Sequence, residues 1–219
     1  ISLGLVGSEM CIRDSYITSD AIKKMVEVIA TANTDALTFC CKPFGTAMNI
    51  SDRYSRTLDE RIYTGHEMFS YCQLHGEFYP TVWLYFFNKK KIGEKYFLEG
   101  IVFEDTPFFF GLMASEIKID YINEVFVWHR MNDGSTMRSE TTNHKLYSNL
   151  VGINKMLEVY KLDPNRTKEQ KRFISWCIES HYRMLRQLRN PDKQTAEINK
   201  AICELIKRNK GFISRGGAI

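Results

Sequence analysis

Apolar and polar positions follow two different periods in the first part of this chain. Over residues 22–29 the apolar side chains recur at i, i+3, i+4 and i+7, and residues 18–20 supply capping oxygens before them. This pattern predicts an amphipathic helix. Residues 36–41 are almost all apolar and predict a buried strand. The further strand-like stretches are 82–87, 101–103, 121–122 and 125–128, the last two separated by Asn123-Glu124.

Residue patterns that are typical of helix ends occur between and after these strand-like stretches. Thr64 and Glu67 have the spacing of a capping box, and Pro107 stands near the start of a predicted helix over residues 106–116. The polar residues 42–61 predict a loop or a small hairpin. Pro164 and Pro191 divide the C-terminal part into three predicted helices, near 141–161, 166–189 and 194–209. The sequence therefore predicts an α/β fold with a helical tail.

Composition narrows the class of protein. The chain has 219 residues, of which 44% are hydrophobic and 13% aromatic, as expected for a folded domain with a core. No apolar run reaches the roughly 20 residues of a membrane span. Six cysteines form no C-x-x-C pair, which favours buried free thiols in a reducing compartment. We therefore expect a cytoplasmic protein.

Charge is unevenly spread. The net charge is +4, yet residues 161–219 hold 14 Lys and Arg against 6 Asp and Glu. A basic tail indicates a phosphate-rich partner, such as the inner face of a membrane, where contact would be peripheral. Solvated faces of a helical bundle are the alternative, and we favour it. Aromatic residues are too sparse in the tail to indicate nucleic-acid binding.

The most informative motif is Phe103-Glu104-Asp105. It places two adjacent carboxylates where an extended apolar stretch gives way to a predicted helix. A carboxylate there faces the positive end of the helix dipole, which favours the ionised form. An ionised aspartate can take a proton from an alcohol. A helix N-cap without a chemical role is the alternative.

Five features in order resemble the C-terminal half of family 2 glycosyltransferases of the bacterial polysaccharide type. The likeness runs from about Tyr16 to about Arg138. The five features are an aromatic segment with Trp83, the basic helix start 88–92, Glu99-Gly100-Ile101-x-x-Glu104-Asp105, residues 121–124 leading into Trp128-His129-Arg130, and Gly134-Ser135-Thr136. The resemblance implies the C-terminal part of a GT-A fold, a Rossmann-like mixed sheet with flanking helices.

The resemblance also implies roles for single residues. Asp105 would be the general base of an inverting sugar transfer, with Glu104 as its neighbour. Arg130 would pair with a diphosphate. His129 would bind a phosphate or a metal, although this position more often carries tyrosine in the family, and a structural histidine is the alternative. Trp83 would stack on a sugar ring, sharing a strand face with Tyr85, or else pack in the core. Ser135, with Thr136, would lie on a loop closing over the donor.

The first residues predict a truncated enzyme. Residues 1–15 resemble translated sequencing-adapter read-through, with a natural irregular terminus as the alternative. The family's metal-binding Asp-x-Asp motif precedes the position of Tyr16, where this chain has Arg13-Asp14-Ser15. We thus expect an artefactual or disordered segment 1–15, a GT-A portion 16–138 and a helical region 139–219.

The expected partners follow from the same resemblance. The intact enzyme would use a nucleotide-sugar donor, a glycan or lipid-linked acceptor, and Mg²⁺ or Mn²⁺ to neutralise the leaving diphosphate. We expect no transferase activity and poor metal binding from the chain alone. The alternative function is a non-enzymatic α/β interaction module, whose basic helical tail docks on an anionic partner.

Overall fold

The chain folds into two compact units. A computed structural model describes residues 15–45, 54, 56–93, 97–131, 140–187 and 193–208. The first unit comprises Ile1–Lys95 and Glu116–Ser139, and the second comprises Tyr96–Ser115 and Glu140–Ile219. This grouping follows packing alone, so the expected division at residue 139 into two domains stays a prediction. Each unit is described by itself below.

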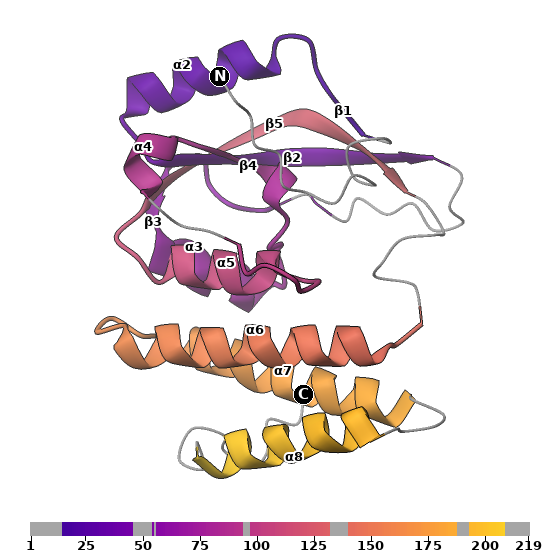
Figure 1. Ribbon diagram of the computed structural model, residues 1–219. Coiled ribbons are helices and arrows are strands. Elements are labelled where there is room, and N and C mark those ends of the chain that lie inside the picture. The colour runs from indigo at the N-terminus through magenta and orange to yellow at the C-terminus, as the bar shows by residue number, and fades with distance from the viewer. Residues whose placement is uncertain are drawn as a thin grey trace. The chain divides into compact units, whose positions relative to one another are not determined.

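The first unit is built on a five-stranded mixed sheet (Figure 1). Strand β5 pairs in parallel with β2, and β5 pairs in antiparallel fashion with β1 and β3. Strand β4 closes the other edge by pairing antiparallel with β2. The strands are β1 (Tyr16–Ile17), β2 (Ala36–Gly45), β3 (Ile62–Thr64), β4 (Tyr85–Phe87) and β5 (Lys118–Met131). This arrangement confirms the predicted mixed α/β class.

Within the part of the chain that the structure describes, the first unit has three α-helices. Helix α2 (Ala21–Ala32) forms where the apolar period predicted a helix, and it buries Met25 and Ile29 of that period together with Ala21. The other two positions of the period, Ile22 and Val26, are exposed. Helix α3 (Gly65–His75) begins with the predicted capping box between Thr64 and Glu67. Helix α4 (Lys89–Ile92) is one turn long. Figure 1 shows α2 and α3 on opposite faces of the sheet.

A bulge explains the polar pair in the middle of β5. Thr38 of β2 lies opposite Tyr121, and Cys40 lies opposite Val125, so β5 uses four residues where β2 uses two. The extra residues include Asn123 and Glu124, both exposed. The predicted break at this pair is thus a bulge inside one strand, not a gap between two strands.

Three predicted segments were wrong. Residues 42–45, expected in a loop or a small hairpin, instead continue the long strand β2, where Pro43 lies opposite His129 of β5. Trp83 lies in the 3₁₀ turn η1 (Val82–Leu84), so it does not alternate with Tyr85 on one strand face. Residues 101–103 form a bend instead of a strand. Positive φ angles of 73° at Gly100 and 64° at Phe103 break the extended backbone there.

The second unit is helical. Helix α5 (Asp105–Met113) packs on α6 (Asn143–Leu162), and α6 also contacts α7 (Lys168–Gln187) and α8 (Lys193–Arg208). The last three helices confirm the three that the prolines predicted. Phe110 of α5 stacks with Phe173 of α7 at a centroid distance of 6.2 Å, and both side chains are buried. No helix in the described ranges is long and apolar enough to cross a membrane.

Gly152 of α6 offers a test of this packing. A Cβ atom at Gly152 would lie 3.6 Å from Pro107 Cγ, an ordinary contact distance, so Gly152→Ala should gain helix propensity without a clash. We expect the free energy of unfolding to rise by about 0.5–1 kcal/mol in urea titrations. Gly100→Ala is the control, because φ is positive at Gly100 and alanine should destabilise. A loss of stability in Gly152→Ala would contradict this packing.

Candidate functional site

Asp105 is the first residue of α5, and its side chain is partly buried. Its Oδ1 accepts a hydrogen bond from the Thr106 amide at 2.8 Å and another from Thr106 Oγ1 at 3.4 Å. Glu104 occupies the N-cap position, and its side chain makes no capping bond. Burial, and then the negative charge of Glu104, raise the pKa of Asp105 to about 6. Desolvation therefore outweighs the helix dipole that was expected to keep this carboxyl readily ionised.

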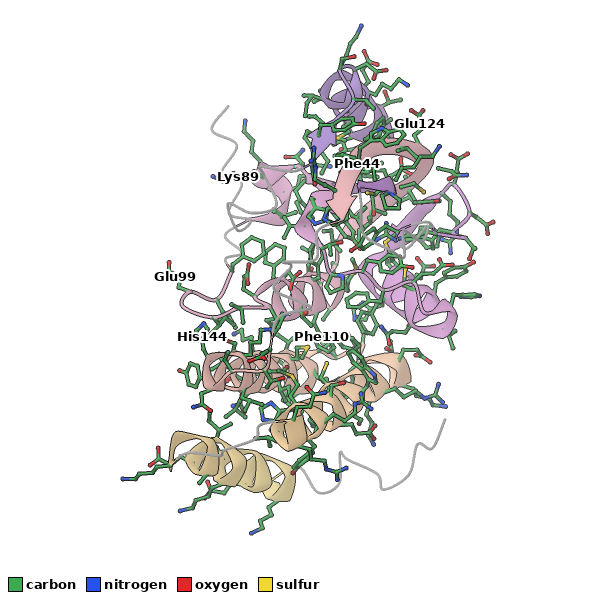
Figure 2. The ribbon with its side chains drawn as sticks, turned by 90° about the vertical axis from the view of Figure 1, so that its right-hand side faces the viewer. Phe44, Lys89, Glu99, Phe110, Glu124 and His144 are labelled. Atoms are coloured by element: carbon green, nitrogen blue, oxygen red, sulfur yellow. The ribbon has the colours of Figure 1, made fainter. Side chains whose placement is uncertain are left out.

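The turn before Asp105 is tied to the helices of the same unit. The Val102 amide donates to Ser148 Oγ of α6 at 3.1 Å. Phe97 stacks on Phe108 of α5 at 4.2 Å between ring centroids. A bulky residue with φ near +64°, as at Phe103, is rare and is held only by its surroundings. These contacts fix the backbone that carries Glu104 and Asp105, whereas Glu99 projects from the same turn into solvent (Figure 2).

Trp83 and His129 come together in the first unit. Their rings stack with centroids 4.7 Å apart and an interplanar angle of 10°. Tyr54 meets both rings edge-on, at 4.8 Å from Trp83 and 5.8 Å from His129. Tyr79 in turn meets Tyr54 at 5.5 Å. We call these four residues the aromatic cluster.

His129 is a neutral member of the cluster. Burial lowers its pKa, so the imidazole carries no charge at neutral pH. Its Nδ1 is buried and has no hydrogen-bond partner among the described residues. Within the described ranges no group of three or more His, Cys, Asp and Glu side chains could hold a metal ion. The divalent cation expected for the intact enzyme stays a prediction.

Arg130 follows His129 and points elsewhere. Its side chain is exposed, and its guanidinium carbon lies 5.1 Å from the centre of the Phe44 ring, which Figure 2 labels at the end of β2. The guanidinium is therefore accessible for an anionic ligand. Ser135 and Thr136 lie outside the described residues.

Arg56 supports the cluster from inside the unit, and the sequence did not indicate it. The side chain is only 5% exposed. One terminal nitrogen donates to Thr38 Oγ1 at 2.8 Å and to the Phe39 carbonyl at 3.2 Å, and the other donates to the Tyr85 hydroxyl at 3.2 Å. The guanidinium also lies 5.4 Å from the centre of the Tyr79 ring. An arginine in a polar stretch resembles a surface residue, so only the fold reveals this role.

The predicted site residues fall into two groups. Glu104 and Asp105 belong to the second unit, and Trp83, His129 and Arg130 belong to the first. The structure unites Trp83 with His129, and it unites Glu104 with Asp105. The carboxylate pair and the aromatic cluster are therefore each described by themselves.

Comparison with known proteins gives limited information. No family model matches the chain, and no curated protein matches its sequence. Among solved structures, residues 1–349 of TarS from S. aureus, in complex with UDP-GlcNAc, are similar with a TM-score of 0.49 and 11% identity. The match covers 89% of this chain and 57% of the TarS chain, so this chain spans little more than half of that length. A similarity of this size supports no statement about chemistry.

Neutralising Asp105 should stabilise the protein at neutral pH. The carboxyl titrates near 3.9 when unfolded and near 6 when folded. The folded state therefore binds the extra proton between these values, and its stability falls as pH rises through them. Asp105→Asn keeps the acceptor oxygen and removes the buried charge. We expect it to raise the free energy of unfolding at pH 7 by roughly 1–3 kcal/mol, with the gain vanishing near pH 4.

Urea titrations at several pH values measure this difference. Glu99→Gln is the matched control, because Glu99 is exposed in the preceding turn and should change stability by less than about 0.5 kcal/mol. An Asp105→Asn protein that is less stable than the parent at pH 7 would mean that Asp105 stabilises the helix start.

Proposed function

We propose that the protein carrying this chain is an inverting, nucleotide-sugar-dependent glycosyltransferase of family 2. It would transfer a sugar to a glycan or lipid-linked acceptor of cell-surface polysaccharide assembly. Support comes first from the five ordered sequence features, which include Glu104-Asp105 and Trp128-His129-Arg130. The observation that carries the proposal is the burial of Asp105 at the start of α5, which raises its pKa to about 6.

A carboxylate with this pKa suits the proton transfer. At pH 7 about nine in ten such groups are ionised, and a pKa near the working pH makes a stronger base than an ordinary aspartate. The acceptor hydroxyl gives its proton to Asp105 while its oxygen bonds to the anomeric carbon. The bond from that carbon to the diphosphate breaks on the opposite side, which inverts the configuration. Glu104 assists by raising the pKa of Asp105.

Residues of the first unit would bind the donor. Trp83 offers an aromatic face to the C–H groups of a sugar, and its stacking with His129 and Tyr54 fixes the ring. Arg130 has an exposed guanidinium that suits a diphosphate. Ser135 is proposed on the sequence resemblance alone. The sugar-binding role of Trp83 rests on that resemblance. The contacts of its ring with His129 and Tyr54 support a rigid surface for stacking.

A divalent cation remains part of the proposal for the intact protein. Mg²⁺ or Mn²⁺ would neutralise charge on the leaving diphosphate when bound. The described residues provide no group that fits it. We therefore assign no catalytic step of this chain to a cation.

Substitution of Asp105 tests the proposed base. In the natural protein that carries this chain, release of nucleotide from a panel of nucleotide sugars reports turnover. Asp105→Asn should lower kcat/KM by about 10²–10⁴-fold, the usual contribution of a general base. Glu99→Gln should leave kcat/KM unchanged. Full activity in Asp105→Asn would overturn the role of Asp105, and no turnover with any donor would favour the non-enzymatic interaction module.

The pH profile provides an independent test. The parent enzyme should lose kcat/KM as pH falls through about 6, because protonated Asp105 cannot accept a proton. In Glu104→Gln this limb should move to lower pH, because the neighbouring negative charge that raises the pKa of Asp105 is gone. An unmoved limb would mean that another group controls the profile.

A further inference from the structure

One face of helix α7 carries basic side chains around an exposed tryptophan. At 3.6 residues per turn, its six most outward positions fall within a sector of roughly 80°. All six are exposed. We call them the α7 stripe: Lys168, Arg172, Trp176, Glu179, Arg183 and Arg186.

The stripe has four basic side chains and one acidic side chain, that of Glu179. Among the described residues, none of its four basic side chains forms a salt bridge with a carboxylate, and Arg183 donates instead to Ser180 Oγ at 2.7 Å. Four like charges along one face repel one another, which an anionic partner would relieve.

Neighbouring helices show the ordinary arrangement. On α6 the exposed Lys155 pairs with Glu158 at 3.4 Å. The exposed charges of α8 alternate in sign along the helix, which neutralises that face locally: Lys193, Glu197, Lys200, Glu204 and Lys207. Solvated helix faces thus account for α6 and α8, whereas the α7 stripe differs from both.

Trp176 adds an apolar group at the centre of the stripe. Trp176 is 55% exposed to solvent, whereas Trp83 and Trp128 are half-buried. Trp176 stacks on the buried Phe173 at 5.9 Å, so the ring is held in place. Amphipathic rings of this kind concentrate at the boundary between lipid headgroups and acyl chains.

We propose that the α7 stripe docks on the surface of an anionic phospholipid bilayer. The stripe runs about 27 Å along the helix, at 1.5 Å per residue. Its basic side chains form two pairs, Lys168 with Arg172 and Arg183 with Arg186, on either side of Trp176 and Glu179. Arg172 and Arg183 are about 16 Å apart along the helix, so the two pairs match an extended anionic surface better than a single small anion. The arginines and Lys168 contact headgroup phosphates, and Trp176 enters the headgroup boundary. Contact is peripheral, and it does not depend on the proposed transferase activity.

Vesicle sedimentation tests the docking. The full chain is mixed with vesicles of phosphatidylcholine alone, or with about one-third phosphatidylglycerol. We expect binding only to the anionic vesicles, weakened by salt, because surface attraction is screened. Arg172→Glu, Arg183→Glu and Arg186→Glu together should reduce binding at least about tenfold. The matched control reverses three exposed lysines of the first unit, Lys23, Lys89 and Lys90, and should bind like the parent.

Tryptophan fluorescence tests the orientation without relying on charge reversal. Anionic vesicles should shift the emission of the parent protein to shorter wavelength, and Trp176→Phe should lose this shift while still sedimenting with vesicles. Three results would overturn the proposal. These are no binding by the folded parent protein, equal loss in both triple variants, or tighter binding to double-stranded RNA than to anionic vesicles at equal salt.

Discussion

The parallel pairing of β2 with β5 is the interaction on which the first unit depends. Strand β5 also pairs with β1 and β3, and β2 holds β4, so every strand is attached to this pair. Thr38 of β2 lies opposite Tyr121 of β5, and Arg56 binds both residues. The Arg56 guanidinium donates a hydrogen bond to Thr38 Oγ1, and the Arg56 carbonyl accepts one from the Tyr121 hydroxyl. A few residues further along, the pairing of Pro43 with His129 sets the ring of His129 against Trp83. The same ladder therefore builds both the core and the aromatic cluster.

The second unit holds an unfavourable group. A partly buried carboxyl beside another carboxylate is costly to keep ionised, and the two hydrogen bonds from Thr106 do not restore the ordinary pKa of Asp105. The left-handed backbone at Phe103 adds strain two residues earlier. Features that lower stability persist where the surrounding structure holds them, and they concentrate at functional sites. This combination distinguishes Asp105 from an ordinary helix-capping aspartate, which would stabilise the helix.

Local signals predicted much of the fold. The apolar period of α2, the capping box of α3 and the prolines around α7 depend on neighbouring residues, and the structure confirmed those helices. Trp83 and residues 101–103 were misassigned, because a single 3₁₀ turn and a positive φ at Phe103 leave no period to detect. Arg56 could not be found either, since its burial arises from β2, β4 and Tyr79, which are distant in sequence. The order of the motifs in the sequence indicated the candidate site residues. Their burial and their contacts could be found only in the structure.

The environment of the Asp105 carboxyl can be measured directly. Carbon-detected NMR can follow its side-chain resonance between about pH 3 and pH 9, a span that includes the ordinary pKa of aspartate. Spectra of the Asp105→Asn protein would assign the signal. We expect a titration midpoint near pH 6. A midpoint near or below 4, the value of an exposed or capping aspartate, would contradict it.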